Sequence, residues 1–358
     1  MKENLDTLLI TGEDIQSIIK SVGLDAIMDE LIENTYEAFV NFNRDETIIP
    51  IRSGFNYSEP AEGLVEWMPV YNTKQEEVLV KIVGYHPRNP DLYRLPTIIS
   101  SVSRYDTRTG HLKALVDGVL PTSLRTGAIS AVASKLLGYE QTENIGLIGC
   151  GAQAITQLHA LSRVFTIKNV YYYDTDTQTE QSFIDRCQML NLDCEFIKSD
   201  ITTIISESDI VSTATSIGIG EGPLFDNIKP KDWLHINAIG SDFPGKFEVP
   251  LSLLKKSYVC PDWINQAKIE GECQQLEDDQ IGEDLSDCLK KANELTHLKN
   301  QCTVFDSTGL ALQDLVASDI LLKYAGQMGL GQHITLENTN LDEKNPYSFL
   351  SKLTEAKK

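Results

Sequence analysis

Two basic side chains of the 358-residue chain are expected at positions that disfavour a positive charge. Lys81 is within the apolar run VLVKIVG, where a buried ammonium needs a charged partner, although an edge-strand lysine could face water instead. Arg125 is expected in the first turn of a helix from Pro121 to Leu137, where the helix dipole disfavours a cation. A bound anion such as a substrate carboxylate would resolve this conflict. The alternative is an exposed arginine that tolerates a small penalty.

Two carboxylates could work beside these cations. Asp242 lies in the Gly/Pro-rich segment GSDFPGK, just past an expected strand end, where it could take a proton from a substrate amine. A loop-capping aspartate is the alternative. Glu66, in VEWMP, could assist in the same chemistry or simply alternate outward on a strand.

A glycine-rich turn indicates a nucleotide site. Gly149-Cys-Gly151-Ala-Gln-Ala154 follows the apolar run NIGLI and opens an expected helix. Gly149 permits a tight turn, Gly151 lets the backbone approach a pyrophosphate, and Ala154 allows close packing of helix on strand. The alternative is a Rossmann-like sheet whose glycine turn binds no nucleotide, but the strand–helix–strand context favours dinucleotide binding.

The choice of dinucleotide depends on the end of the next strand. Asp174 ends the run NVYYYD and could accept hydrogen bonds from the ribose hydroxyls of NAD, whereas it would repel the extra phosphate of NADP. Neither Thr175 nor Asp176 offsets that repulsion, so the sequence favours NAD(H). Thr215, at the end of the run DIVSTAT, could contact the cofactor or reflect strand propensity alone.

The elements that would position these residues follow an α/β pattern. Thr11 is expected to cap a first helix, and the region 48–120 contains short strand-like runs, including a hairpin around Asp106–Gly110. After Gly138, strands and helices alternate, which predicts a Rossmann-type, doubly wound parallel sheet. A last helix, at about 309–328, should return to a second, discontinuous α+β domain. The acidic stretch Glu277–Asp284 is expected to be a solvated loop.

Composition excludes several classes of partner. The formal net charge of −21 disfavours binding to nucleic acid or to anionic lipid, and no apolar run is long enough to cross a bilayer. The N-terminal residues lack the apolar core of a secretion signal, so a cytoplasmic protein is expected. Seven scattered cysteines without metal-ligand spacing are expected to be reduced, mostly buried thiols, and no metal site is expected.

Several segments together resemble the ornithine cyclodeaminase/μ-crystallin family, and within it the ornithine cyclodeaminase branch. The matching segments run in family order from about residue 50 to 320: VEWMP, VKIVGYHPRN, LRTGAISAVASK, IGLIGCGAQA, YYYDTD, HINAIGSDFPGK, IEGECQQL and VFDSTGLALQD. VEWMP and GSDFPGK are the most discriminating of them.

The resemblance implies roles for individual residues. Arg52, Lys81 and Arg125 would hold the α-carboxylate of an amino acid, Asp242 would handle its amine and protons, Glu66 would assist, and Thr308 would contact the substrate. The implied NAD contacts are Thr97, Arg125, Gly149, Gly151, Ala152, Gln153, Asp174, Thr215, Ile239, Gly240, Ser241, Lys246 and Ser307.

The reaction implied by the resemblance is redox-neutral overall. NAD⁺ would take hydride from Cα of L-ornithine, the δ-amine would close the ring with loss of ammonia, and hydride return would give L-proline. An amino-acid dehydrogenase, a ketimine reductase or a lysine cyclodeaminase of the same fold are the alternatives. The family precedent also implies a homodimer, with residues 1–132 and 316–358 forming the substrate and dimerisation domain and 133–315 the NAD domain.

Overall fold

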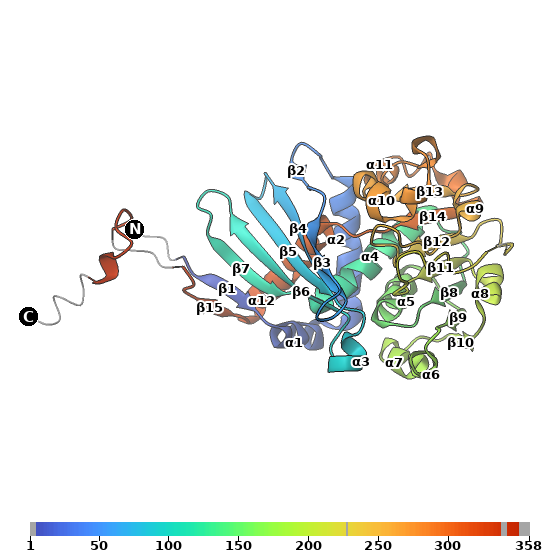
Figure 1. Cartoon of the computed structure of the whole chain (residues 1–358), viewed down its shortest axis with the longest axis horizontal. Helices are drawn as coiled ribbons and strands as arrows, with labels where there is room; N and C mark the ends of the chain where they lie inside the picture. The colour runs from blue at the N-terminus through green and yellow to red at the C-terminus, as the bar shows by residue number, and fades with distance from the viewer. Residues whose placement is uncertain (1–4, 227, 338–341, 351–358) are drawn as a thin grey trace, which may run out of the picture.

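The computed structural model describes residues 5–226, 228–337 and 342–350. It contains two separate β-sheets with helices packed between and around them (Figure 1). The expected α/β class is therefore confirmed, with a parallel sheet and a second sheet of different architecture.

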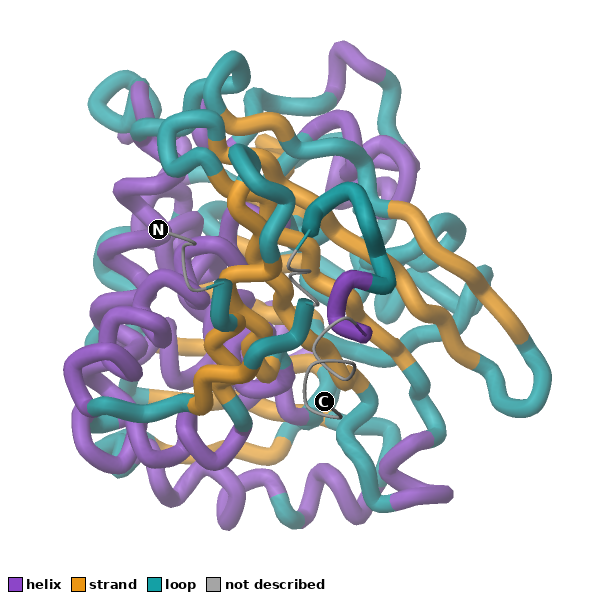
Figure 2. Tube along the Cα trace, turned by 90° about the vertical axis from the view of Figure 1, so that its left-hand side faces the viewer, coloured by secondary structure: helices purple, strands orange, loops and turns teal. Residues whose placement is uncertain are grey.

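The second sheet, here called the mixed sheet, has eight strands among the described residues, in the order β15-β1-β7-β6-β5-β4-β2, with β3 paired to β4. Its strands are β1 (Thr7–Ile10), β2 (Thr47–Ile48), β3 (Ser53–Tyr57), β4 (Gly63–Asn72), β5 (Glu77–Tyr85), β6 (Ile98–Asp106), β7 (Leu112–Asp117) and β15 (Gln332–Ile334). The expected hairpin is confirmed: β6 and β7 pair antiparallel around a turn in which Gly110 has φ of 76°. When the molecule is viewed from the left-hand side of Figure 1, strands run across its centre and helices line its left side (Figure 2).

The parallel sheet has seven strands among the described residues, in the order β10-β9-β8-β11-β12-β14-β13. Its strands are β8 (Asn144–Ile148), β9 (Asn169–Tyr173), β10 (Glu195–Lys198), β11 (Ile210–Thr213), β12 (His235–Ala238), β13 (Tyr258–Pro261) and β14 (Thr303–Asp306). Strand order reverses between β8 and β11, which is the switch point where such sheets bind ligands. Ile210 and Val211 are adjacent in β11, so their side chains point to opposite faces of the sheet. They belong to two different apolar cores, which shows that both faces are covered.

Helices pack against both the mixed sheet and the parallel sheet. Their bounds are α1 (Gly12–Val22), α2 (Leu24–Val40), α3 (Asn89–Tyr93), α4 (Val119–Leu137), α5 (Ala152–Val164), α6 (Thr177–Gln181), α7 (Phe183–Cys187), α8 (Ile201–Glu207), α9 (Leu251–Leu254), α10 (Ile264–Glu270), α11 (Leu285–Lys290) and α12 (Ala311–Met328). Thr11 caps α1 in a capping box with Asp14, as expected. Helix α4 is buried along most of its length because it packs against both α2 and α5, and so lies between the two sheets (Figure 1).

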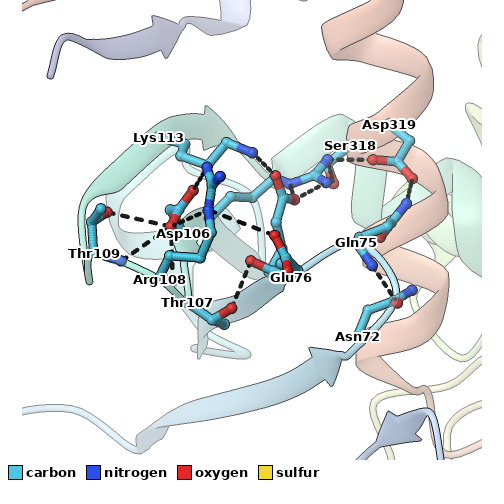
Figure 3. A network of polar contacts seen from close by, with 12 residues as sticks. Asn72, Gln75, Glu76, Asp106, Thr107, Arg108, Thr109, Lys113, Ser318 and Asp319 are labelled. Carbon is cyan, nitrogen blue, oxygen red and sulfur yellow. Dashed lines mark hydrogen bonds and ion pairs between the residues drawn. The ribbon is translucent and has the colours of Figure 1, made fainter. Parts of the chain in front are cut away.

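Helix α12 follows β14 of the parallel sheet and packs on the mixed sheet, as predicted for the last helix. A polar network anchors it there (Figure 3). Arg104 of β6 is buried, donates to Glu77 of β5 at 2.9 Å through Nε, and bonds Asp319 and Ser318 of α12. This anchor ties the middle of α12 to β5 and β6.

The strands of the mixed sheet come from residues 7–117 and 332–334, and those of the parallel sheet come from residues 144–306. The division at 132/133 and 315/316 stays a proposal, and part of its C-terminal segment, 338–341 and 351–358, lies outside the described residues. No helix in the described part of the chain combines the length and apolar character needed to span a bilayer. The cytoplasmic location also stays a prediction.

Candidate active site

The glycine-rich turn lies at the carboxyl end of β8, at the switch point. Gly149 has φ of +91°, and a Cβ atom there would lie 2.6 Å from the carbonyl oxygen of Ala214. Its backbone N–H donates to Tyr173 O at 2.9 Å, which ties the turn to β9. Only glycine fits this position, for both conformational and steric reasons.

The start of α5 suits a pyrophosphate. Gly151 is the N-cap residue, and a Cβ built on it would have no neighbour within 4 Å. No side chain caps α5, so the backbone N–H groups at Ala152 and Gln153 remain available to an anion in that space. The Gln153 side chain donates to Ser123 O of α4 at 3.3 Å and so braces the turn.

Asp174 follows β9 and is fixed beside this turn. Its two carboxylate oxygens accept the N–H groups of Cys150 at 2.7 Å and of Asp176 at 2.8 Å. A carboxylate held here can accept hydrogen bonds from ribose hydroxyls. Arg186 of α7 reaches the same turn and donates to Cys150 O at 2.8 Å, a contact that inspection of the residues after Asp174 could not reveal.

A buried carboxylate not predicted from the sequence, Glu248, organises the adjoining edge of the parallel sheet. Its oxygens accept from the hydroxyls of Thr213 at 2.6 Å and Thr215 at 2.7 Å, and from Gly240 N at 2.8 Å. Burial raises the pKa of Glu248, and these hydrogen bonds oppose the rise. Glu248 therefore holds the ends of β11 and β12 together, and the Thr215 hydroxyl is engaged in that task.

The remaining predicted cofactor residues line the same edge or the facing loop. Ile239 N donates to Thr213 O at 2.9 Å, and Ser307 N donates to Ala238 O at 3.0 Å. The buried Ser241 hydroxyl donates to Lys246 O at 2.7 Å. Thr97 precedes β6, on the mixed-sheet side, where its carbonyl accepts His86 N at 2.8 Å.

Lys81, Arg125 and Asp314, here called the basic cluster, meet between β5, α4 and α12. Lys81 Nζ lies 3.0 Å from Asp314 Oδ1, and Arg125 Nε lies 3.6 Å from the same oxygen. Arg125 also donates to the Gln313 side chain. The guanidinium packs against Gly309, where a Cβ would lie 2.9 Å from it.

Two expectations about these cations are now decided. Lys81 is buried on β5, between β4 and β6, so the edge-strand alternative is wrong. The placement of Arg125 in a first turn is also wrong, because α4 begins at Val119, six residues earlier, and Pro121 lies inside that first turn. Burial beside Asp314, rather than a helix dipole, defines the environment of Arg125.

Arg52, Glu66, Asp242, Lys246 and Glu270, here called the acidic cluster, meet where the mixed sheet faces the parallel sheet. Arg52 Nε lies 2.5 Å from Glu270 Oε1 and 3.8 Å from Glu66 Oε2. The Arg52 guanidinium donates to the backbone oxygen of Asp242 at 2.8 Å, and Lys246 Nζ lies 3.4 Å from the Asp242 carboxylate. Arg52 is thus grouped with carboxylates rather than with Lys81 and Arg125.

The two clusters share one site. Glu66 and Lys81 project from the same face of adjacent strands, with Glu66 opposite Val83 and Met68 opposite Lys81. Burial, followed by the charge of Arg125, lowers the pKa of Lys81 to about 8. Burial raises the pKa of Glu66 and raises that of Glu270 to about 7, in both cases against the opposing charge of Arg52.

Several buried polar atoms in and beside the basic cluster have no hydrogen-bond partner. Among the described residues they include Arg125 Nε, Ser307 Oγ, Gln313 Nε2 and Asp314 Oδ2. Because buried polar groups are normally paired, this concentration marks a place prepared for a polar ligand. Thr308 differs: its hydroxyl donates to Asp262 at 2.9 Å and accepts from Gln266 at 2.8 Å, so it is already engaged.

The arrangement can bind an amino acid next to a nicotinamide. The basic cluster can hold a carboxylate, the partly exposed Asp242 can accept a proton, and the turn at Gly149–Gly151 can hold a dinucleotide. No group of three or more His, Cys, Asp or Glu side chains in the described ranges could hold a metal ion. Sequence reasoning missed Asp314, Glu270 and Glu248, although the first two lie in the segments VFDSTGLALQD and IEGECQQL.

Known proteins share this architecture. The chain matches the ornithine cyclodeaminase/mu-crystallin family over residues 13–325. The L-lysine cyclodeaminase of Streptomyces rapamycinicus is 38% identical over 96% of this chain and 100% of its own. A solved lysine cyclodeaminase, studied for its recognition of L-lysine, L-ornithine and L-2,4-diaminobutyric acid, is 40% identical, covers 96% of this chain and 99% of its own, and gives a TM-score of 0.92.

A more distant solved structure shares the fold over nearly the whole chain. An archaeal alanine dehydrogenase dimer with bound NAD is 29% identical, covers 93% of this chain and 100% of its own, and gives a TM-score of 0.81. The two-sheet fold, the dinucleotide turn and these similarities agree. The chain belongs to the ornithine cyclodeaminase/mu-crystallin family.

Proposed function

We propose that this protein is an NAD-dependent cyclodeaminase of an L-diamino acid, with L-lysine as its first substrate and L-pipecolate and ammonia as its products. One observation carries the proposal: the site pairs a basic cluster of two cations and one carboxylate with an acidic cluster of three carboxylates and two cations. The basic cluster therefore has one positive charge in excess, and the acidic cluster has one negative charge in excess. A molecule with a carboxylate and a second amino group supplies the opposite charge to each.

The chain's own residues have distinct tasks in this reaction. Lys81 and Arg125 bind the α-carboxylate and fix the position of Cα. Asp242, the most exposed of the three carboxylates at 37%, takes the proton of the α-amine, and Lys246 Nζ lies 3.4 Å from its carboxylate. Bound NAD⁺ supplies the chemistry of taking a hydride from Cα and returning it after ring closure. Glu66 supports the proton transfers from β4.

The cofactor would be held by the turn from Gly149 to Gln153 and by Asp174. The open space above Gly151 supports this assignment, as does the NAD bound to the archaeal relative. The preference for NAD over NADP rests on the Asp174 carboxylate.

L-Ornithine, converted to L-proline, is the second candidate substrate. The segments VEWMP and GSDFPGK favour it, and the solved lysine cyclodeaminase recognises L-ornithine as well as L-lysine. The similarity of 38% to 40% to lysine cyclodeaminases supports giving L-lysine the first place.

The test is a panel of amino acids incubated with NAD⁺, in which ammonia, NADH and cyclic product are each followed. We expect ammonia and a cyclic imino acid in equal amounts, without net NADH. Stoichiometric NADH with a keto acid would identify an amino-acid dehydrogenase instead. Activity only on a supplied cyclic imine and NADH would identify a ketimine reductase.

We also propose that the protein is a homodimer joined through the outer face of the mixed sheet. Phe55, Trp67, Ile82 and Ile99 are exposed there, and Trp67 and Ile82 are directly paired across β4 and β5. The archaeal relative is a dimer. Light scattering should give twice the chain mass, and the double change Trp67→Lys and Ile82→Glu should give a monomer.

A further inference from the structure

We propose that Glu270 binds the second amino group of the substrate and thereby selects diamino acids over monoamino acids. This inference rests on the proposed cyclodeaminase function and adds a specificity residue to it. It assigns to Glu270 a task distinct from that of Asp242, which acts on the α-amine.

The position of Glu270 is costly for a carboxylate. It is 5% exposed and is the last residue of α10, at the end of the helix where the dipole disfavours a negative charge. The charges of Glu66 and Asp242 act on it unfavourably as well. The charge of Arg52 offsets these unfavourable effects, through the contact of 2.5 Å. A site that concentrates three carboxylates in this way is suited to a cationic ligand.

The charge balance around Glu270 leaves room for one cation. Lys246 is committed to Asp242 at 3.4 Å, and Arg52 is shared between Glu270 and Glu66. One of the three carboxylates therefore has no cation of its own. An α-ammonium group cannot fill this place while Asp242 deprotonates it, whereas a second ammonium on the side chain can.

Glu270 is suited to bind this amine and also to deprotonate it. Burial raises its pKa to about 7, so the carboxylate can take one proton from the side-chain ammonium. The neutral amine then forms a C–N bond to the oxidised Cα, and the original Cα–N bond breaks. The α-nitrogen leaves as ammonia after receiving the proton that the ring nitrogen gives up, and Glu270 returns its own proton to solvent.

The experiment compares ligands with and without the second amino group. In Glu270→Gln, cyclisation of L-lysine should fall by about 100-fold, as expected for the loss of a charged hydrogen bond in a buried site, while NADH-dependent reduction of the six-membered cyclic imine should change by less than about 3-fold. Calorimetry with NADH bound, where L-lysine cannot be oxidised, should show weaker L-lysine binding and unchanged L-pipecolate binding. If L-ornithine is the substrate, it and the five-membered imine replace this pair.

Two further variants complete the design. Glu270→Asp keeps the charge and should lower the ratio of cyclisation to imine reduction by only about 10-fold. Glu272→Gln, a buried neighbour that accepts Glu248 N at 2.7 Å, should leave that ratio unchanged.

Equal losses on both ligands, in whichever Glu270 variant folds, would show that Glu270 merely holds Arg52 and would overturn the inference. Failure of the unaltered protein to cyclise any diamino acid would instead refute the proposed function.

Discussion

Lys81 and Asp314 form an ion pair of 3.0 Å in which the two side chains are only 1% and 2% exposed. They are 233 residues apart in the chain, on β5 and α12, and Arg125 of α4 shares the same carboxylate. One aspartate thus neutralises part of the charge of two buried cations from different elements.

Replacing Asp314 should strongly destabilise the folded protein. Asp314→Asn leaves two buried cations without their counterion, so we expect the free energy of unfolding to fall by about 3–5 kcal/mol. Denaturant unfolding would measure the change. Asp185→Asn, on the exposed face of α7, should alter stability by less than about 0.5 kcal/mol. Similar small effects in both variants would refute the importance of the pair.

Asp242→Asn should separate catalysis from cofactor binding. The variant keeps the backbone oxygen that accepts Arg52 but loses the base, so turnover should fall by about 100-fold or more. Fluorescence titration should show NADH binding close to that of the unaltered protein. Normal turnover would mean that another group accepts the proton.

Asp174→Ala should weaken dinucleotide binding selectively. Loss of the ribose contacts should raise the Kd for NADH by about 10-fold or more and reduce the preference over NADPH. Asp193→Ala, an exposed aspartate in the same part of the chain, is the control and should change neither value. An unchanged preference in Asp174→Ala would assign cofactor choice to other residues, such as Arg186.

Asp306→Asn should alter how stability depends on pH. Burial raises the pKa of Asp306 to about 7, with Asp262 contributing, from an ordinary value of 3.8. Between these values the folded protein holds a proton that the unfolded chain has released, so this group makes stability fall as pH rises toward 7. The variant should therefore be more stable than the unaltered protein at pH 8, by about 1–3 kcal/mol, and similar to it at pH 4. Equal melting-temperature differences at both pH values would contradict this.

Local patterns in the sequence predicted the local structures well. The turn at Gly149 and Gly151 and the cap at Thr11 depend on residues next to each other in the chain, and both appear as expected. The start of α4 differs from the prediction because Pro121, a common first-turn residue, lies two residues after the helix begins at Val119.

The polar partners could not be predicted because they come from distant segments. Nothing near Lys81 in the sequence points to Asp314, and nothing near Arg52 points to Glu270. The acidic stretch expected to be a solvated loop illustrates the same limit. It holds Asp284, which is buried and lies 2.6 Å from the guanidinium of Arg44, 240 residues earlier in the chain. Each of these pairs forms only once segments far apart in the sequence are folded together.

The acidic cluster spans the two halves of the molecule: Glu66 extends from the mixed sheet, whereas Asp242 and Glu270 come from segments attached to the parallel sheet. In the proposed complex, a diamino acid bound at its carboxylate by Lys81 and Arg125 and at its second amine by Glu270 connects the two halves. The length of its carbon chain must therefore match the distance from the basic cluster to Glu270.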